Sequence, residues 1–328
     1  MTPVSARLAF LDVGQGNCAV LYAGKSSIVF DCPPGSILPR FLRSRGIASV
    51  DHLVISHSDK DHSGGVRALI ASGVDVRRLW ILDDQLNETR HYHGIARAFA
   101  DARSKGAGEM RRGVPHSDSE TVNWGEYGIE WLAPNHEDRM LRGSRNSLSV
   151  VSRLCHSDVG LVLFPGDLDL AGYTALGANA RDWRAEWLVA PHHGGLTGTQ
   201  AETVEFLGML RERTEAKYVL FSFARDNRWE YPRPGTVEKV RRLGASAVCT
   251  QLAKSCAEDL PTERRGSGLP AAGARGAGLS CCAGSLLLEL RGGVVAWEGQ
   301  EDHQGLVSGF LGARCAPQPA GAMEQMVR

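Results

Sequence analysis

The segment that most restricts the fold of this chain is His57-Ser-Asp59-Lys-Asp61-His62, which follows an apolar, strand-like run and precedes a pair of glycines. Four side chains of metal-binding type lie here within six residues, where a strand ends and a helix is expected to begin. Because the chain leaves regular structure at such a point, these side chains no longer alternate between faces and can converge on one position. A polar helix cap is the alternative interpretation, but it explains one carboxylate and not two flanked by histidines. The pattern therefore indicates a metal site.

Two later segments repeat this arrangement. One apolar run ends in Gly166-Asp167, and another ends in His192-His193 before two further glycines. Taken singly, a Gly-Asp pair is commonly a turn, and a histidine pair often caps or packs. Three such strand ends in one chain are much more specific, and they predict one shared site.

Charge and hydropathy restrict the partners. Of the 328 residues, 37 are Lys or Arg and 37 are Asp or Glu, so the formal net charge is zero. Any affinity for nucleic acid must therefore come from a local patch. The N-terminal run lacks the features of a secretory signal, and no stretch approaches the roughly 20 apolar residues that cross a bilayer. We expect a soluble, cytoplasmic protein that does not contact a membrane.

Short β-rich runs alternate with helical stretches and fall into two halves, each with strands followed by helices. The two halves predict an α+β fold in which two sheets pack together with helices outside. Residues 1–300 form a single domain in this interpretation, with Gly- and Pro-containing loop insertions near 104–123 and 257–280. A hairpin over 286–297 closes the domain, and residues 301–328 are expected to be a flexible tail.

Six motifs together identify a family. They are Phe10-Leu-Asp-Val-Gly-Gln-Gly-Asn17, His57-x-Asp59-x-Asp61-His62, Asn146-Ser-Leu-Ser-Val150, Gly166-Asp167, His192-His193-Gly194 and Asn227-Arg-Trp-Glu-Tyr-Pro232. The chain resembles the metallo-β-lactamase superfamily and, within it, the soluble hydrolase domain of competence proteins of the ComEC/Rec2 type, from residue 8 to about residue 250. The resemblance implies an αββα four-layer sandwich and a metal-dependent hydrolase. A freestanding hydrolase is expected, because this sequence has no counterpart of the competence proteins' membrane channel.

The resemblance also implies a role for each matching residue. The implied ligands are His57 and Asp59 for one metal ion, Asp61 and His62 for the other, and Asp167 as the bridge between them. We favour His192 as the ligand that completes the second site, with His193 beside it or in contact with substrate. Asp61 and Asp167 are the catalytic candidates.

Three positions depart from the family pattern. Asp59 stands where the wider superfamily has histidine, and Asn146 or Ser147 falls where a further histidine ligand is expected. Both departures predict that the first metal ion is held weakly. Tyr231 replaces the histidine of the last motif, which puts an acid role at that position in doubt.

The ligand set determines the chemistry that we expect. Two divalent ions about 3.5–4 Å apart activate a water molecule and stabilise the oxygens of a displacement, which suits cleavage of a phosphodiester. The carboxylates favour Mn²⁺ and the general affinity order favours Zn²⁺, so both are candidates for the bound ions. The resemblance supplies DNA as the substrate class, with RNA or a nucleotide second messenger next. A hydrolase of lactones, thioesters or amides, or a non-catalytic binding module, is the alternative.

Further candidates lie around this site. Lys60 and Asn146 are substrate-binding candidates, although a lysine at such a position is often simply solvated. Arg228 and Tyr231 lie with Trp229 in a loop predicted near the metal face, where they can grip a phosphate backbone and stack a base. An arginine-rich surface loop is the alternative.

Four cysteines crowd the C-terminal third of the chain: Cys249, Cys256, Cys281 and Cys282. They are candidates for a structural Zn²⁺ site with four thiolates. Their spacing is not the usual Cys-x2-Cys pair, and free thiols are the alternative.

Overall fold

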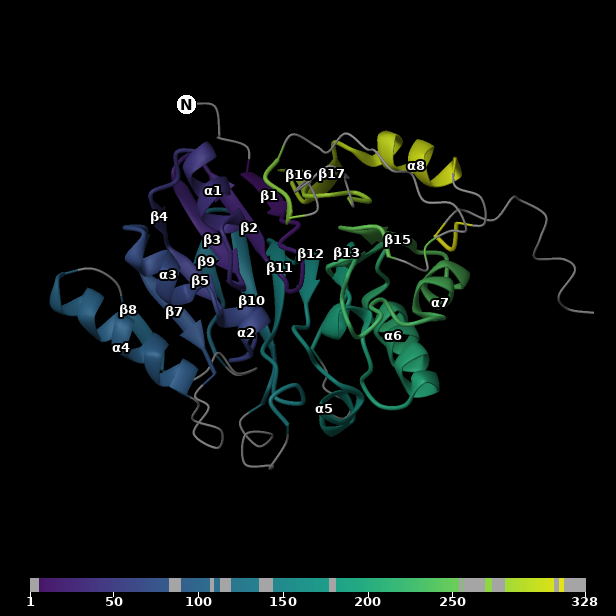
Figure 1. The fold of residues 1–328 in the computed structure, drawn as a ribbon, viewed down its shortest axis with the longest axis horizontal. Coiled ribbons are helices and arrows are strands. Elements are labelled where there is room, and N and C mark those ends of the chain that lie inside the picture. Colours follow the sequence, from purple (N-terminus) through teal and green to yellow (C-terminus); the bar gives the residue numbers. More distant parts are fainter. Residues whose placement is uncertain are drawn as a thin grey trace, which may run out of the picture.

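Two β-sheets packed face to face form the centre of the molecule (Figure 1). The computed structural model describes residues 6–82, 90–106, 109–112, 119–135, 144–176, 181–253, 256, 269–272, 281–309 and 313–315. Within these residues the first sheet has eight strands in the order β17-β16-β1-β2-β3-β5-β7-β8, and the second has seven in the order β15-β14-β13-β12-β11-β10-β9. Each sheet joins an antiparallel part to a parallel part, at β3 in the first and at β12 in the second.

The elements have the following bounds. The first sheet contains β1 (Ala6–Phe10), β2 (Ala19–Ala23), β3 (Ser26–Phe30), β5 (His52–Val54), β7 (Arg78–Ile81), β8 (Glu109–Arg112), β16 (Leu286–Arg291) and β17 (Val294–Trp297). The second contains β9 (Val122–Trp124), β10 (Tyr127–Ala133), β11 (Val151–His156), β12 (Val159–Phe164), β13 (Trp187–Val189), β14 (Tyr218–Phe221) and β15 (Ser246–Cys249). A separate pair is β4 (Ser49–Val50) and β6 (Asp75–Val76). The helices are α1 (Ile37–Ser44), α2 (Lys60–Ser63), α3 (Val66–Ala71), α4 (Arg90–Ser104), α5 (Leu170–Ala175), η2 (Pro191–Gly194), α6 (Gln200–Thr214), α7 (Thr236–Arg242) and α8 (Gln300–Ser308).

Neighbouring residues on the central strands face opposite layers, because successive side chains of a strand alternate. On β5, Val54 is buried between the sheets and Leu53 against the outer helices. On β12, Val162 is buried between the sheets and Leu163 against the helices of the other side. Helices α1, α3 and α4 cover the first sheet, and α5, α6 and α7 cover the second (Figure 1). The predicted αββα four-layer sandwich is confirmed.

Two predicted loop regions contain regular structure. Strand β8 lies inside the loop expected near 104–123 and pairs in parallel with β7 at the end of the first sheet. Its sequence, Glu-Met-Arg-Arg, lacks the apolar signal of a strand because an edge strand tolerates charged residues. Helix α8 occupies the start of the expected flexible tail, where Val307 and His303 are buried. Most of the loop expected near 257–280 lies outside the described residues, which include only 269–272 of it.

Candidate metal centre

Three strand ends from the two sheets meet at one edge of the sandwich. Strand β5 leads to His57 and then to α2, which has Asp59 as its N-cap. Strand β12 leads to Asp167, and β13 leads to the short helix η2. Gly166 makes the junction possible, because its φ is +58° and a Cβ there would lie 2.6 Å from the Cβ of Ser56. The close approach at this glycine brings Asp167 of the second sheet beside His57 of the first.

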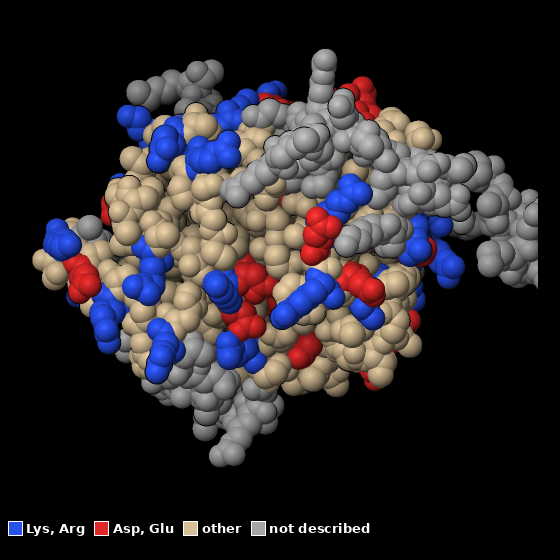
Figure 2. Space-filling model, viewed as in Figure 1, with Lys and Arg blue, Asp and Glu red and all other residues tan. Residues whose placement is uncertain are grey.

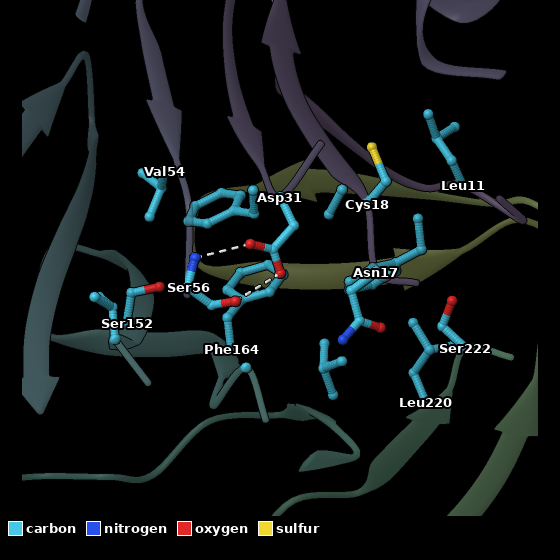
Figure 3. A pocket seen from close by; sticks show the side chains of 16 residues that line it. Leu11, Asn17, Cys18, Asp31, Val54, Ser56, Ser152, Phe164, Leu220 and Ser222 are labelled. Carbon is cyan, nitrogen blue, oxygen red and sulfur yellow. Dashed lines mark hydrogen bonds between the residues drawn. The ribbon is translucent and has the colours of Figure 1, made fainter. Parts of the chain in front are cut away.

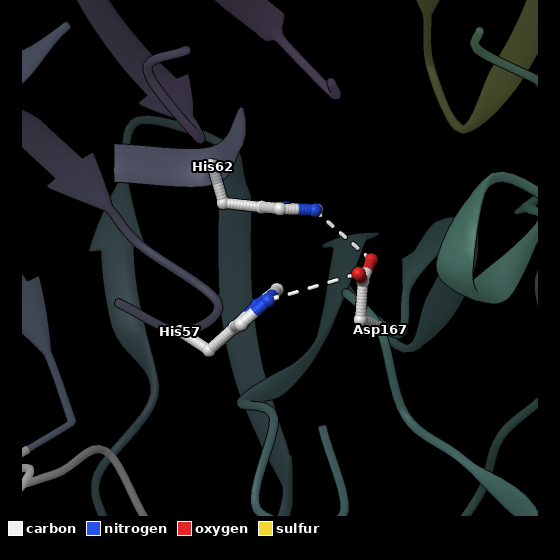
Figure 4. A group of neighbouring side chains, drawn as sticks. All are labelled: His57, His62 and Asp167. Atoms are coloured by element: carbon white, nitrogen blue, oxygen red, sulfur yellow. Dashed lines mark ion pairs between the residues drawn. The ribbon is translucent and has the colours of Figure 1, made fainter. Parts of the chain in front are cut away.

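Asp167 is buried at the centre of the cluster (Figure 4). Its Oδ1 lies 2.9 Å from His62 Nε2, and its Oδ2 lies 3.7 Å from His57 Nε2. Ligand atoms fall into two groups, each with all atoms within 4.8 Å of one another. The first group is His57, His62 and Asp167, and the second is Asp61, His62 and His193. The strand ends predicted from the sequence therefore converge, and His62 belongs to both groups.

The structure places His193, rather than the favoured His192, in the second group. His193 Nε2 lies 3.3 Å from His62 Nε2 and 3.5 Å from Asp61 Oδ2, and the side chain is fully buried. His192 Nε2 lies 3.2 Å from the hydroxyl of Tyr231 and 3.8 Å from Asp167 Oδ2. Both histidines have positive φ, 50° and 59°, and this left-handed turn directs the second side chain inward. Burial also argues against the predicted contact of His193 with substrate.

Two hydrogen bonds orient the histidines from behind. Asp31, which follows β3, has Oδ2 2.7 Å from His62 Nδ1, while its Oδ1 accepts the N–H of Ser56 at 2.8 Å (Figure 3). His193 Nδ1 lies 2.9 Å from the carbonyl oxygen of Ser222. Both rings thus turn Nε2 toward the centre, as carboxylates and carbonyls do behind metal-bound histidines. Asp31 was not predicted from the sequence, although it too directly follows an apolar strand.

The buried polar atoms fit a cation. His57 Nε2 has no hydrogen-bond partner within the described residues, and the only partner described for the buried Asp167 Oδ1 at hydrogen-bond distance is His62 Nε2, at 2.9 Å. Burial opposes ionisation of Asp167, but the nearby His62, His193 and His57 hold its pKa well below the usual range. Burial and the neighbouring His62 together lower the pKa of His57 to about 4, so this ring is neutral. A buried carboxylate beside three histidine nitrogens is a donor set that suits a divalent metal ion.

Asp59 is engaged differently from the other predicted ligands. Its Oδ1 forms an ion pair with Arg145, and its Oδ2 lies 3.8 Å from His57 Nε2. Both partners of the ion pair are about one-third exposed. At the positions where the family pattern has histidine, Ser147 donates to Asp169 Oδ2 at 2.9 Å, and the Asn146 carbonyl accepts the N–H of Ser149. The first metal position therefore lacks the family's histidine and has Asp59 engaged by an ion pair, and Arg145 is a further side chain at the site.

An aromatic stack leads from the surface to the cluster. The rings of Trp229 and Tyr231 are stacked at 5.8 Å, and Tyr231 is stacked on His193 at 6.0 Å. The guanidinium of Arg228 lies 4.5 Å from the centre of the Trp229 ring, which is 42% exposed. Burial, Asp167 and Asp61 raise the pKa of Tyr231 to about 12, so its hydroxyl stays protonated. Lys60 is exposed on α2.

The predicted cysteine site does not form. Among the described residues, no three of Cys249, Cys256, Cys281 and Cys282 make a metal-binding group. Cys281 lies 3.6 Å from Asp12 Oδ2, whereas Cys282 lies 3.5 Å from His303. Burial raises the pKa of Cys249 well above its usual value and that of Cys256 to about 11. Cys249 and Cys256 are therefore protonated thiols that pack in the apolar cluster of the second sheet.

Comparison with known proteins decides the family. The family model described as "Metallo-beta-lactamase superfamily" matches residues 11–214. The chain belongs to the metallo-β-lactamase superfamily. The expected metallo-β-lactamase fold is confirmed, and the family match together with the His/Asp cluster supports a hydrolase of the kind that binds divalent metal ions. No helix in the described part of the chain has the length and hydropathy needed to cross a membrane.

Two curated relatives are competence-associated proteins. The chain is 25% identical to competence protein ComA of Neisseria gonorrhoeae, over 75% of this chain and 31% of that protein. It is 24% identical to ComE operon protein 3 of Bacillus subtilis, over 63% of this chain and 24% of that protein. The chain thus spans less than a third of either relative. Among solved structures it is similar to the metallo-β-lactamase fold protein YhfI of Bacillus subtilis, with 11% identity, a TM-score of 0.48, and coverage of 74% of this chain and 95% of that chain.

Proposed function

We propose that this protein is a metal-dependent phosphodiesterase that cleaves single-stranded DNA or another nucleotide phosphodiester. The proposal depends on buried Asp167, whose two oxygens face His57 and His62. His62 belongs to both ligand groups. Cationic and aromatic side chains lie between this cluster and the protein surface. The sequence motifs of the competence-type hydrolases support nucleic acid as the substrate class. A phosphodiester suits such a centre because charge develops on oxygens at both ends of the displacement.

The proposal includes two divalent ions, Zn²⁺ or Mn²⁺, held with unequal affinity. Asp61, His62, Asp167 and His193 would hold the stronger ion, and His57, Asp59 and Asp167 the weaker one. A bound divalent ion lowers the pKa of a coordinated water and stabilises negative charge on phosphoryl oxygen. Asp61 stays ionised at neutral pH, since burial is outweighed by its hydrogen bond with His193 and by the charge of His62, which together lower its pKa.

Side chains around the cluster would bind the rest of the substrate. The protonated hydroxyl of Tyr231 can donate a hydrogen bond to a phosphate oxygen, and the exposed ring of Trp229 can stack on a base. Arg145, paired with Asp59, and Arg228, beside Trp229, supply positive charge. Lys60 and Asn146 remain candidates for contact with the substrate, and His192, which lies beside the Tyr231 hydroxyl, becomes one instead of a ligand.

End-labelled single-stranded DNA incubated with Mn²⁺ or Zn²⁺ tests the proposal. We expect metal-dependent release of shorter products, and Asp167→Asn should abolish it while the protein stays folded, because the bridging charge is lost. Tyr231→Phe should weaken cleavage less. The proposal would be overturned if DNA and bis(p-nitrophenyl) phosphate both stay intact after prolonged incubation while the same preparation hydrolyses a lactone or thioester.

A further inference from the structure

A basic groove of about 590 Å³ lies between α3 and α4. Its lining includes Arg67 of α3 and Arg90, His93 and Arg97 of α4, with Asp101 at one end. Figure 2 shows blue side chains gathered over the region of these helices, on the left of the view. The groove is separate from the metal centre, and none of its residues belongs to the ligand groups.

Helix periodicity places the charges in one row. Arg90, Arg97 and Asp101 recur at intervals that keep them on the same side of α4, while Ile95 and Phe99 are buried against the sheet. Gly94 lies within this row and has no side chain, so the aliphatic part of the Arg67 side chain can pack against α4 at this position. A Cβ at Gly94 would lie 3.2 Å from both Cδ and Nη1 of Arg67. The close packing holds the guanidinium of Arg67 in the groove beside those of α4.

Within the described residues, the positive charge of this row has no carboxylate partner. Arg67, Arg90 and Arg97 are exposed, and none forms an ion pair with a carboxylate in the described ranges. Other exposed arginines do have such partners, for example Arg184 with Asp182 at 3.0 Å and Arg291 with Glu289 at 2.6 Å. Like charges within a Debye length of about 10 Å repel one another, so a row of unpaired guanidinium groups is stabilised by an anionic ligand. Planar guanidinium groups match the oxygens of a phosphate.

A side-chain contact joins α4, which lines the groove, to α2, which carries two of the candidate ligands. His91 of α4 has Nε2 2.9 Å from the hydroxyl of Ser63, and Ser63 belongs to α2 together with Asp61 and His62. Exposed Lys60 is on the same short helix. Burial lowers the pKa of His91, and the charges of Arg67 and Lys60 contribute to this, which is the effect of a positive field between α2 and α3. A polyanion leaving the metal centre past Lys60 would reach the groove next.

We propose that the groove between α3 and α4 binds the phosphate backbone of a single-stranded polynucleotide substrate, several nucleotides away from the bond that is cleaved. This inference rests on the proposed function for the identity of the polyanion. It predicts that a long strand binds more tightly than a short one and that the difference depends on salt.

The test uses an Arg90→Gln/Arg97→Gln variant of the full chain, with Arg103→Gln as the matched control. Arg103 is exposed on the same helix but does not line the groove. Fluorescence anisotropy in EDTA measures the Kd of a labelled oligothymidylate of about 20 nucleotides at several salt concentrations. We expect the groove variant to bind about tenfold more weakly at low salt, with a salt slope smaller by about 1.4 for two lost phosphate contacts. The control should match the original protein, and an oligothymidylate of about 4 nucleotides should show no difference between the three proteins.

Cleavage assays separate this inference from the proposed function. Each protein's rate on the long strand is compared with its own rate on bis(p-nitrophenyl) phosphate, a diester too small to extend from the metal centre to the groove. A selective loss on the long strand supports the groove. If DNA is cleaved but the variant and the control have equal Kd and equal salt slope, the groove proposal is wrong and the proposed phosphodiesterase activity stands. If only the groove variant loses binding and none of the three proteins cleaves either diester, the groove proposal stands and the proposed phosphodiesterase activity is wrong.

Discussion

Replacing Asp31 by Asn tests how the histidine shared by both ligand groups is oriented. One oxygen of Asp31 accepts the N–H of Ser56 at 2.8 Å, and the other lies 2.7 Å from His62 Nδ1 and accepts the Ser56 hydroxyl at 3.1 Å. Donors therefore face both oxygens. The amide nitrogen of asparagine would meet a donor at either position, so Asp31→Asn loses at least one of these bonds and fixes His62 less firmly. Loss of such an orienting carboxylate typically costs 10- to 100-fold in metal affinity, about 1.4–2.7 kcal/mol.

Competition with a chromophoric chelator measures this affinity, and a thermal melt of the metal-free protein checks folding. Ser56→Ala removes the hydroxyl but keeps the backbone donor, so we expect it to lose less than about tenfold. Asp182→Asn is the control, because this carboxylate pairs with Arg153 at 2.9 Å outside the metal centre. It should lower the melting temperature without changing metal affinity. A folded Asp31→Asn protein with unchanged metal affinity would refute the reasoning.

Three further results are expected. His193→Ala should remove the tighter divalent ion and His192→Ala should not, as elemental analysis after dialysis will show; the reverse order would contradict the ligand assignment. Arg145→Ala should strengthen binding of the weaker ion up to about fivefold in titration calorimetry, since it frees Asp59 from a partly exposed ion pair worth about 0–1 kcal/mol. Weaker binding in this variant would instead show that Arg145 supports the site. Burial lowers the pKa of His52 to about 4, below the value of about 6.5 in the unfolded chain. Between pH 6.5 and pH 4 the unfolded chain therefore binds a proton at His52 that the folded protein does not. Urea unfolding should show the free energy of unfolding falling by on the order of 2 kcal/mol as the pH drops from 7 to 4, and falling less in His52→Gln. An equal pH dependence in both proteins would exclude this histidine as the cause.

The fold and the meeting of the strand ends could be predicted because each depends on a local pattern. Apolar runs such as Leu161–Phe164 indicate strands that are covered on both faces. The residue after such a run lies at the end of its strand in any tertiary structure. Strand β8 escaped prediction because its sequence has no apolar run, and its place in the sheet follows from backbone pairing with β7. Helix α8 escaped because few of its residues are apolar and its burial depends on neighbours distant in sequence.

The exact ligand set could be predicted less well, because it depends on backbone angles and distant contacts. His192 and His193 are equivalent in sequence, and only the left-handed turn at both residues decides which ring is buried. Asp31 has the same strand-end position as the predicted ligands, but it is a single carboxylate next to Cys32-Pro33. Its contact with His62 joins residues 31 positions apart, which no spacing rule captures.

Arg145 shows why the number of metal ions does not follow from the motif alone. Asp59 can pair with this arginine or ligate an ion with His57, and the two uses compete for one carboxylate. A partly exposed ion pair is worth about 0–1 kcal/mol, whereas a divalent ion carries twice the charge of the guanidinium and is attracted by buried Asp167 as well. We therefore expect the weaker ion to displace Arg145 rather than to be excluded by it. The released guanidinium would then lie at the exposed side of the centre, where a substrate phosphate can replace Asp59 as its partner.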